Sequence, residues 1–431
     1  MERMIAMRNK TQDTERAVFT KAMRKEYTIL VPTMLPVHFK FFQEIFRQHG
    51  YKVDILDTSG PTVVEEGLKN VHNDTCYPAL VVIGQLMEAV KSGRYDPHKI
   101  ALLLSQTGGG CRASNYIHLL RKALKKSGYG YIPVISLNMG GLEKNPGFQL
   151  NLTIAMKLIY AVILGDLFML LANQCRPYEI NPGDTDRVVD EQVKKCMDAL
   201  LDKKIFHVRS IKFEYQSILD AFAAIPRRQE EKPRVGIVGE IYVKFSPLGN
   251  NHLEDFLLSE GCEVVMPGLL DFCMYCLYNG IIDHKLYGSR LAHLVASRFG
   301  FDFLLKKQKA MISVIEKHGV FRAPTAFDHT KDLADGYINH GVKMGEGWLL
   351  TAEMLELIEQ GVNNIVCTQP FGCLPNHIVA KGMMHAIKEK HPQANIVAVD
   401  YDPGASEVNQ QNRIKLMLAN ARVAMTVGGE K

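Results

Sequence analysis

The chain has 431 residues, of which 47% are hydrophobic and 23% charged, with a formal net charge of +5. This length predicts two to three domains, and the composition is that of an ordinary soluble globular protein. The charge is small for so long a chain, and the sequence contains no nucleic-acid-binding signature, so we expect no nucleic-acid partner.

The N-terminal stretch lacks the long apolar segment of a secretory signal, which predicts a cytoplasmic protein. Residues 150–171 form the most apolar stretch and are long enough to span a bilayer. Lys157 and Asp166 within this stretch favour a buried helix or a subunit interface instead, and we expect no membrane partner. The nine cysteines, in a chain without an export signal, predict reduced thiols or metal ligands rather than disulfides.

Residues 1–26 are predicted to form a charged helical arm that precedes a first α/β domain over residues 27–180. Within this domain short apolar segments alternate with helical ones. The predicted strands are residues 27–32, 51–57, 99–104 and 131–137, and the predicted helices are residues 36–50, 113–126 and 150–171. Such alternation is typical of a parallel sheet covered on both faces.

Residues 181–232 are charged and mostly helical, and they end in the linker-like sequence PRRQEEKPR. A second α/β domain over residues 233–431 follows, with a helical insertion at about 284–341. Its predicted strands are residues 234–239, 263–266, 364–367 and 395–400. The predicted fold class is therefore α/β, with two tandem Rossmann-like or flavodoxin-like parallel-sheet domains and additional helical segments.

Four cysteines occur where a predicted strand ends or a helix begins, two in each half of the chain: Cys76, Cys111, Cys367 and Cys373. Open parallel sheets bind ligands at the carboxyl ends of their strands, so these edges of two facing domains can meet in one cleft. Helix N-termini also favour an anionic thiolate or an anionic metal–sulfur cluster.

Three glycines, Gly108, Gly109 and Gly110, come directly before Cys111. Their sequence lacks both the P-loop pattern and G-x-G-x-x-G, so a nucleotide site is poorly supported. Glycines do let backbone N–H groups approach an anion closely, which suits the sulfides of an iron–sulfur cluster.

Cys273 and Cys276 form a C-x-x-C motif, which places both thiols on one face of a helix. Half a zinc site or two packed core thiols are the alternatives for this pair. The contexts of three further cysteines, Cys175, Cys196 and Cys262, predict structural roles. The six remaining thiols exceed one tetrahedral zinc site, and no histidine pair occurs at ligand spacing, so iron–sulfur chemistry is favoured.

Seven sequence motifs together resemble the 2-hydroxyacyl-CoA dehydratase superfamily over about residues 28–425. They are NDTCYPA, TGGGCRASNY, RPYE, VGEIYVKFSP, GEGWLLTAEM, VCTQPFGCLPNH and VAVDYDPGASEVNQQNRIKLML. Within this superfamily the chain most resembles the double-cubane cluster proteins. The same module is also similar to the C-terminal part of the large CoA-dehydratase activase-related proteins.

The resemblance implies a homodimer with a double-cubane cluster in each subunit, that is, two 4Fe–4S cubanes joined by a bridging sulfide. It also implies a separate ATP-hydrolysing iron–sulfur activator of the acetate and sugar kinase fold. Cys76, Cys111 and Cys367 match the cysteines that hold the single cubane of the family dehydratases. The resemblance leaves Cys273, Cys276 and Cys373 as the additional ligands, with Cys175 as the reserve candidate for Cys273 or Cys276.

The expected function is an iron–sulfur reductase that accepts low-potential electrons from the activator and reduces a small molecule at the double cluster. Candidate proton donors are His72, His377, Glu240 and Glu346, and each has a structural hydrogen-bonding role as its alternative. Two other functions stay open: a 2-hydroxyacyl-CoA dehydratase component with a single 4Fe–4S cluster, and a non-enzymatic electron-transfer module. Residues 150–171 are expected either at the dimer contact or in the core of their own domain.

Overall fold

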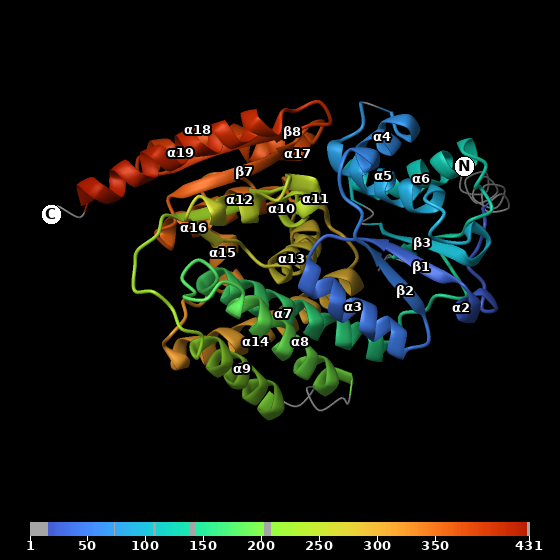
Figure 1. The fold of residues 1–431 in the computed structure, drawn as a ribbon, viewed down its shortest axis with the longest axis horizontal. Coiled ribbons are helices and arrows are strands. Elements are labelled where there is room, and N and C mark those ends of the chain that lie inside the picture. The colour runs from blue at the N-terminus through green and yellow to red at the C-terminus, as the bar shows by residue number, and fades with distance from the viewer. Residues whose placement is uncertain (1–15, 73, 107–108, 138–142, 202–207, 429–431) are drawn as a thin grey trace. The chain divides into compact units, whose positions relative to one another are not determined.

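Each half of the chain builds one four-stranded parallel sheet in the computed structural model of the protein (Figure 1). The structure describes residues 16–72, 74–106, 109–137, 143–201 and 208–428, and for residues 208–210 and 424–428 only the backbone. The chain divides into two compact units. Unit 1 comprises Met1–Thr33 and Gln43–Ala155, and unit 2 comprises Met34–Phe42 and Met156–Lys431.

The sheet of unit 1 has the strand order β2-β1-β3-β4, and all its strands are parallel. Its strands are β1 (Thr28–Pro32), β2 (Lys52–Leu56), β3 (Ile100–Ser105) and β4 (Val134–Leu137). The central strand β3, with the sequence IALLLS, is buried along all but its last residue, as expected for a sheet with both faces covered. Its helical segments are α2 (Met23–Glu26), α4 (Pro61–Asn70), α5 (Tyr77–Lys91), η1 (Pro97–Lys99), η2 (Arg112–Asn115) and α6 (Tyr116–Lys126).

The sheet of unit 2 is also fully parallel and repeats the same topology, with the order β6-β5-β7-β8. Its strands are β5 (Arg234–Gly239), β6 (Glu263–Val265), β7 (Asn364–Pro370) and β8 (Asn395–Tyr401). In both sheets the first strand pairs with the second on one side and with the third on the other. The connections therefore change direction between the two central strands, which creates a topological switch point in each unit.

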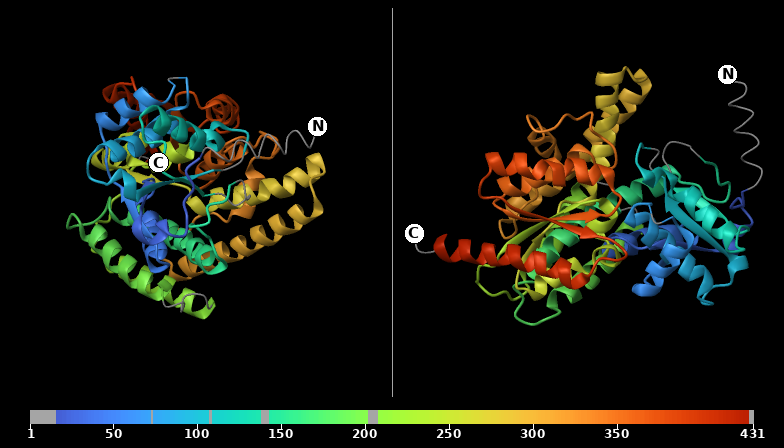
Figure 2. Two further views of the ribbon diagram at one scale, coloured as in Figure 1. Left: turned by 90° about the vertical axis from the view of Figure 1, so that its right-hand side faces the viewer. Right: turned by 90° about the horizontal axis from the view of Figure 1, so that it is seen from above.

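Long helices cover the sheet of unit 2 and extend beyond it. Between β4 and β5 lie α8 (Asp184–Leu201) and α9 (Val208–Ala223), and between β5 and β6 lie α10 (Ile241–Phe245), α11 (Pro247–Asn250) and α12 (Leu253–Ser259). The remaining helical segments are α13 (Leu269–Tyr287), α14 (Leu291–His318), α15 (Phe327–Leu333), α16 (Trp348–Glu359), α17 (Leu374–Val379), η4 (Lys381–Met383), α18 (Met384–Lys390) and α19 (Glu407–Gly428). Figure 2 shows that α13 and α14 form a hairpin that projects from the rest of unit 2.

Two of the sequence positions at which the units divide fall within helices. These helices are α3 (Pro36–Gln48) and α7 (Leu152–Cys175). Among the described residues, α7 is the one helix long and apolar enough to cross a membrane, with a mean hydropathy of 2.1. Because 61% of its most apolar window is buried within the protein, we interpret it as a core helix. Lys157 and Asp166, the charged residues that argued against a membrane span, are both buried.

The structure confirms the predicted α/β class with two parallel-sheet domains, while several element boundaries differ from the predicted ones. The described part of the N-terminal arm contains only the four-residue helix α2, and residues 1–15 lie outside the described residues. Strand β7 continues to Pro370, three residues beyond the predicted end. The compact units divide between residues 155 and 156, so α8, α9 and most of α7 belong to unit 2 together with the second sheet.

Helices α4 and α5 of unit 1 contact each other through glycines. A Cβ atom on Gly84 would lie 2.1 Å from the carbonyl oxygen of Val63 and 2.9 Å from the amide nitrogen of Gly67. We expect Gly84→Ala to lower the free energy of unfolding by about 2 kcal/mol or more, because the two backbones must move apart. Urea unfolding measures this, with Gly130→Ala as the control, since its nearest neighbour would lie at 3.5 Å. Equal stability of the two variants would contradict the close packing.

Candidate functional site

The two switch points place several of the predicted site residues at the carboxyl edges of the sheets. In unit 2, Glu240 directly follows β5, and the turn that ends at Cys373 directly follows β7. These are the two central strands, and they pair along residues 235–239 and 364–368. In unit 1, Cys111 lies in the connection that leaves the central strand β3. Ligands of open parallel sheets bind at this edge, so these residues are candidates for a ligand site.

Cys76 and Cys111 of unit 1 both stand at helix starts, as the sequence predicted. Cys76 is the residue before α5, and its side chain is buried. Cys111 is the residue before η2, and its Sγ accepts a hydrogen bond from the amide of Ala113 at 3.3 Å. Gly109 and Gly110 are exposed just before Cys111, whereas Gly108 lies outside the described residues. The Cys111 sulfur therefore already accepts from a backbone N–H group at a helix start.

The loops that carry these two cysteines contact each other. The Oη of Tyr116, the first residue of α6, lies 3.0 Å from the Sγ of Cys76. Arg112 donates through Nη1 to the carbonyl oxygen of Asp74 at 2.6 Å. The residues adjacent to one thiol therefore support the loop of the other, and both thiols belong to one local structure of unit 1.

Cys373 occupies the equivalent position in unit 2. It precedes α17, and only 9% of its side chain is exposed. One turn later, Nδ1 of His377 lies 3.0 Å from the Cys373 carbonyl oxygen and also contacts the Gln369 side chain. His377 is exposed, so it lies at the surface of the turn that carries the thiol. His72, the other histidine predicted as a proton donor, is exposed in unit 1 with its Nδ1 3.3 Å from Asp74.

Cys367 does not lie in the turn between β7 and α17 that carries Cys373. Because β7 runs to Pro370, Cys367 is an internal strand residue, fully buried in the hydrophobic core with Val238, Leu350 and Val379. Its Sγ lies 3.6 Å from Oδ1 of Asn376, and burial raises the pKa of this thiol to about 12. The contacts are those of a packed core thiol, so the structure separates the surroundings of Cys367 from those of Cys373.

Cys273 and Cys276 lie on one face of α13, as their spacing predicted. Burial, then the neighbouring Cys276 and the charges of Asp166 and Asp271, raise the pKa of Cys273 above its usual range. Cys276 is the more exposed of the two, and Glu346 is the charged group that acts on it. The pair is thus surrounded by carboxyl groups, which favour protonated thiols or a bound cation over bare thiolates.

The carboxylate of Asp166 holds the beginning of this helix. It accepts hydrogen bonds from the amides of Leu269 at 2.9 Å and Leu270 at 2.8 Å, and Nε2 of His38 lies 2.8 Å from its Oδ1. A carboxylate at a helix N-terminus satisfies donors that have no partner within the helix. Asp166 therefore fixes the segment from which the C-x-x-C motif extends.

Glu240 and Glu346 form a buried pair at the end of β5. Glu240 caps α10 by accepting from the amide of Val243 at 2.9 Å, and Glu346 accepts from the amide of Ile241 at 3.0 Å. Burial and the charge of Glu346 raise the pKa of Glu240 to about 8, and burial also raises the pKa of Glu346. At neutral pH this pair therefore holds a proton, which a general acid requires.

Further buried acidic residues lie next to this pair, and the sequence analysis did not find them. Lys244 contacts Glu353 at 2.9 Å in a fully buried ion pair. Glu356 lies one turn later on α16, and burial with the charge of Glu353 raises its pKa to about 7. Asp271 on α13 accepts from Gln308 at 2.8 Å. The available signal for the pair on α16 was the sequence LLTAEMLELIE, in which Glu353 and Glu356 lie among apolar residues before Glu359 ends the helix.

The described residues bring the predicted ligands together only in part. Cys273 and Cys276 are close enough to influence each other, and the loops of Cys76 and Cys111 adjoin. Among the described residues, no three His, Cys, Asp or Glu side chains gather closely enough to hold one metal ion. The six candidate ligands are distributed as two in unit 1 and four in unit 2.

The raised pKa of Glu240 predicts a specific pH dependence of stability. The folded protein retains a proton up to about pH 8, whereas the unfolded chain releases it near 4.5, so the free energy of unfolding falls as pH rises through this window. We expect Glu240→Gln to reduce this fall and to be a few kcal/mol more stable than the parent at about pH 8. Urea unfolding across this range measures it, with Glu65→Gln on the exposed surface of α4 as the control. An unchanged pH dependence in Glu240→Gln would contradict the assignment.

Comparison with known proteins adds no assignment to this geometry. A scan against protein-family models and a search of curated proteins found no match to the chain. The sequence motifs and the positions of the thiols and carboxyls are therefore the observations that bear on the role of the site.

Proposed function

We propose that this chain is an iron–sulfur reductase that accepts low-potential electrons from an ATP-hydrolysing activator and reduces a small molecule. One observation carries the proposal: Glu240 and Cys373 follow the paired central strands of the second sheet, each at the start of a helix. A carboxyl that holds a proton at neutral pH and a thiol therefore belong to the same switch point. Reduction of a small molecule needs electrons and protons at one place.

The sequence resemblance supplies the cofactor and the partners of this proposal. The cofactor is a double-cubane cluster, and the partners are a second copy of the chain and an activator of the acetate and sugar kinase fold, all in the cytoplasm. When bound, such a cluster stores electrons at low potential and presents iron and sulfide to a small substrate. We assign ATP hydrolysis to the activator because this sequence contains no nucleotide-hydrolysis motif.

Three of the six proposed ligands stand at helix starts that suit an anionic sulfur cofactor, and two more have a spacing that suits metal ligation. Cys76, Cys111 and Cys373 each precede a helical segment, where unpaired N–H groups favour negative charge. Cys273 and Cys276 share one face of a helix, which suits two thiolates to neighbouring metal positions. Metal binding must deprotonate these thiols, so it releases protons.

Cys367 fits the cofactor least well, because its thiol lies in the hydrophobic core and contacts Asn376. Cys175, the reserve candidate, is also fully buried, with Sγ 3.9 Å from the carbonyl oxygen of Phe222 and 3.8 Å from Nη1 of Arg227. Cys367 and Cys175 are therefore both buried thiols with protein contacts of their own.

The buried carboxyls would support reduction in two ways. Glu240 can deliver a proton because its pKa of about 8 keeps it protonated in neutral solution. Negative charge on the acidic residues near Cys273 and Cys276 would lower the reduction potential of a cofactor held there. A cofactor in these surroundings would need a strong electron donor, as the proposed activator provides.

Metal analysis gives the first test. We expect about eight irons and a matching amount of sulfide per chain after anaerobic purification, the content of two cubanes. About four irons would favour the dehydratase alternative with one cubane, and zinc without iron would contradict both.

Two cysteine variants then separate ligation from packing. We expect Cys373→Ala to lose iron because its thiol stands at a helix start, and Cys367→Ala to keep its iron but unfold at a lower temperature because it leaves a core cavity. Iron content and thermal melting measured on both variants give the comparison. Loss of iron from Cys367→Ala alone would reverse the assignment of the two residues.

Turnover tests the reductase function itself. With a strong chemical reductant, we expect at least one small oxidised molecule to increase electron consumption above background, and Glu240→Gln to slow it about tenfold or more at unchanged iron content. Glu65→Gln is the matched control. If no molecule in a broad panel increases electron consumption, the chain is an electron-transfer module rather than an enzyme.

A further inference from the structure

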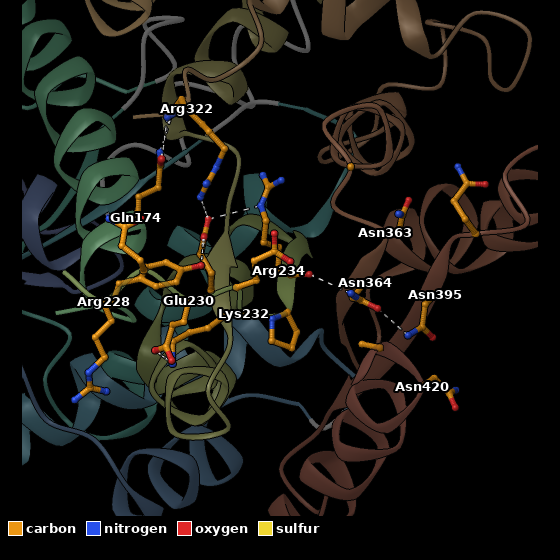
Figure 3. Close-up of a pocket in the computed structure, with 18 of the residues that line it drawn as sticks. Gln174, Arg228, Glu230, Lys232, Arg234, Arg322, Asn363, Asn364, Asn395 and Asn420 are labelled. Atoms are coloured by element: carbon orange, nitrogen blue, oxygen red, sulfur yellow. Dashed lines mark hydrogen bonds and ion pairs between the residues drawn. The ribbon is translucent and has the colours of Figure 1, made fainter. Parts of the chain in front are cut away.

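A large polar pocket of about 1070 Å³ opens at the amino ends of the strands of unit 2, on the edge opposite Glu240 and Cys373 (Figure 3). The first residue of every strand in this sheet lines it: Arg234 of β5, Glu263 of β6, Asn364 of β7 and Asn395 of β8. The linker segment at residues 227–234 contributes another wall. The proposed reductase function makes no use of this pocket.

Positive charge exceeds negative charge at the floor of the pocket. The carboxylate of Glu263 is buried and faces two guanidinium groups, those of Arg322 and Arg234. Tyr178 donates to the second oxygen of the same carboxylate at 2.7 Å. Burial and the charge of Arg322 lower the pKa of Arg234, as expected where two cations share one anion.

The two arginines are held in place while retaining capacity for a ligand. The backbone of Arg322 exchanges two hydrogen bonds with the Gln174 side chain, at 2.9 and 3.0 Å, yet about half of its own side chain is exposed. Arg234 donates from Nη1 to the carbonyl oxygen of Gln360 at 3.2 Å, and its buried Nε lies 3.7 Å from Oε1 of Glu263, beyond hydrogen-bond distance. Figure 3 shows the two side chains approaching from different elements.

Amide side chains line the opposite wall. Asn395 donates to Asn364 at 2.9 Å, and Asn364 donates to the carbonyl oxygen of Arg234 at 3.2 Å, which links the starts of three strands (Figure 3). The Oδ1 of Asn363 is buried and has no hydrogen-bond partner within the described part of the chain. An acceptor in this position suits a hydroxyl or amino donor on a ligand.

We propose that this pocket binds a phosphorylated small molecule, with the phosphate at Arg322 and Arg234 and a hydroxyl or amino group at Asn363. Guanidinium groups bind phosphate oxygens through two parallel hydrogen bonds, which makes arginine well suited to this anion. The pocket is at the upper end of the volumes usual for small-ligand sites, roughly 300–1,000 Å³, so it accommodates far more than a free phosphate. The ligand is therefore of nucleotide size.

Calorimetric titration of the full-length chain at constant ionic strength tests the proposal, with inorganic pyrophosphate, ATP and coenzyme A as probes. We expect saturable binding of at least one probe and a loss of about tenfold or more in affinity in Arg322→Gln. This variant should fold, because the Gln174 contacts use only the backbone of residue 322. Arg298→Gln, which removes an exposed ion pair with Asp302 on α14, should bind like the parent.

A second variant tests the amide wall without removing any charge. Asn363→Ala should weaken ATP or coenzyme A more than pyrophosphate, because only the larger probes carry hydroxyl and amino groups. Equal affinity for pyrophosphate and ATP in the parent would contradict the role of Asn363, because recognition would then rest on the phosphates alone. Failure of all three probes to bind, parental affinity in Arg322→Gln, or binding of a polyglutamate peptide instead of these probes would overturn the proposal. The test is independent of iron content and therefore of the reductase function.

Discussion

The parallel pairing of β5 with β7 fixes the arrangement of unit 2. At the end of this pairing Gly239 lies opposite Thr368, with φ at +147°. A Cβ atom there would be 2.1 Å from Oγ1 of Thr368, so the backbones can approach only because the residue is glycine. Thr368 in turn donates to the carbonyl oxygen of Val238 at 3.2 Å, and its own carbonyl oxygen accepts from Asn376 at 3.1 Å. These contacts define where the helices that begin with Glu240 and Cys373 leave the sheet.

Charge balance is a second constraint on unit 2. Within the described part of unit 2, buried carboxyls outnumber buried lysines: Asp166, Glu240, Glu263, Asp271, Glu346, Glu353 and Glu356 against Lys157 and Lys244. Carboxylates in a low-dielectric interior cannot all ionise, so some of them retain protons at neutral pH. The ion pair of Lys244 with Glu353 compensates one negative charge. Glu240 and Glu346 avoid a second buried charge because their raised pKa values keep a proton on the pair. A proton store is thus a physical consequence of this composition.

Local sequence signals were sufficient for the sheets and for several site residues. Alternation of apolar strands with helices predicted both parallel sheets, and cap positions correctly placed Cys76, Cys111 and Cys373 at helix starts. The predicted end of β7, at residue 367, was wrong. Gln369 and Pro370 are not typical strand residues, yet they pair with β8. That error also placed Cys367 at the end of the strand rather than within it. Tertiary packing, which no local pattern contains, determined this outcome.

The pocket lined by Arg234 and Arg322 could not be predicted from the sequence for a similar reason. Its residues come from the linker, α7, the strand starts and the segment after α14, and nothing in their spacing along the chain brings them together. The sequence places Arg227 and Arg228 in a linker, yet Arg227 contacts the Cys175 thiol at 3.8 Å and lies over the Phe321 ring. Only the strand order of the sheet brings these segments to one edge.

The two edges of the second sheet carry charges opposite to the helix dipoles that meet there. Helices that follow the strands direct their N-terminal, partly positive ends to the carboxyl edge, where Glu240 caps α10. The Glu240 carboxyl thus offsets part of the positive field at the start of α10, whereas no side-chain cap hydrogen bond among the described residues occurs at the start of α17, after Cys373. At the amino edge the helix C-termini are partly negative, and Arg234 and Arg322 offset them. Anion binding at this edge depends on arginine side chains rather than on helix termini. Each edge can therefore acquire its own ligand chemistry by changes in a few side chains, without any change of fold.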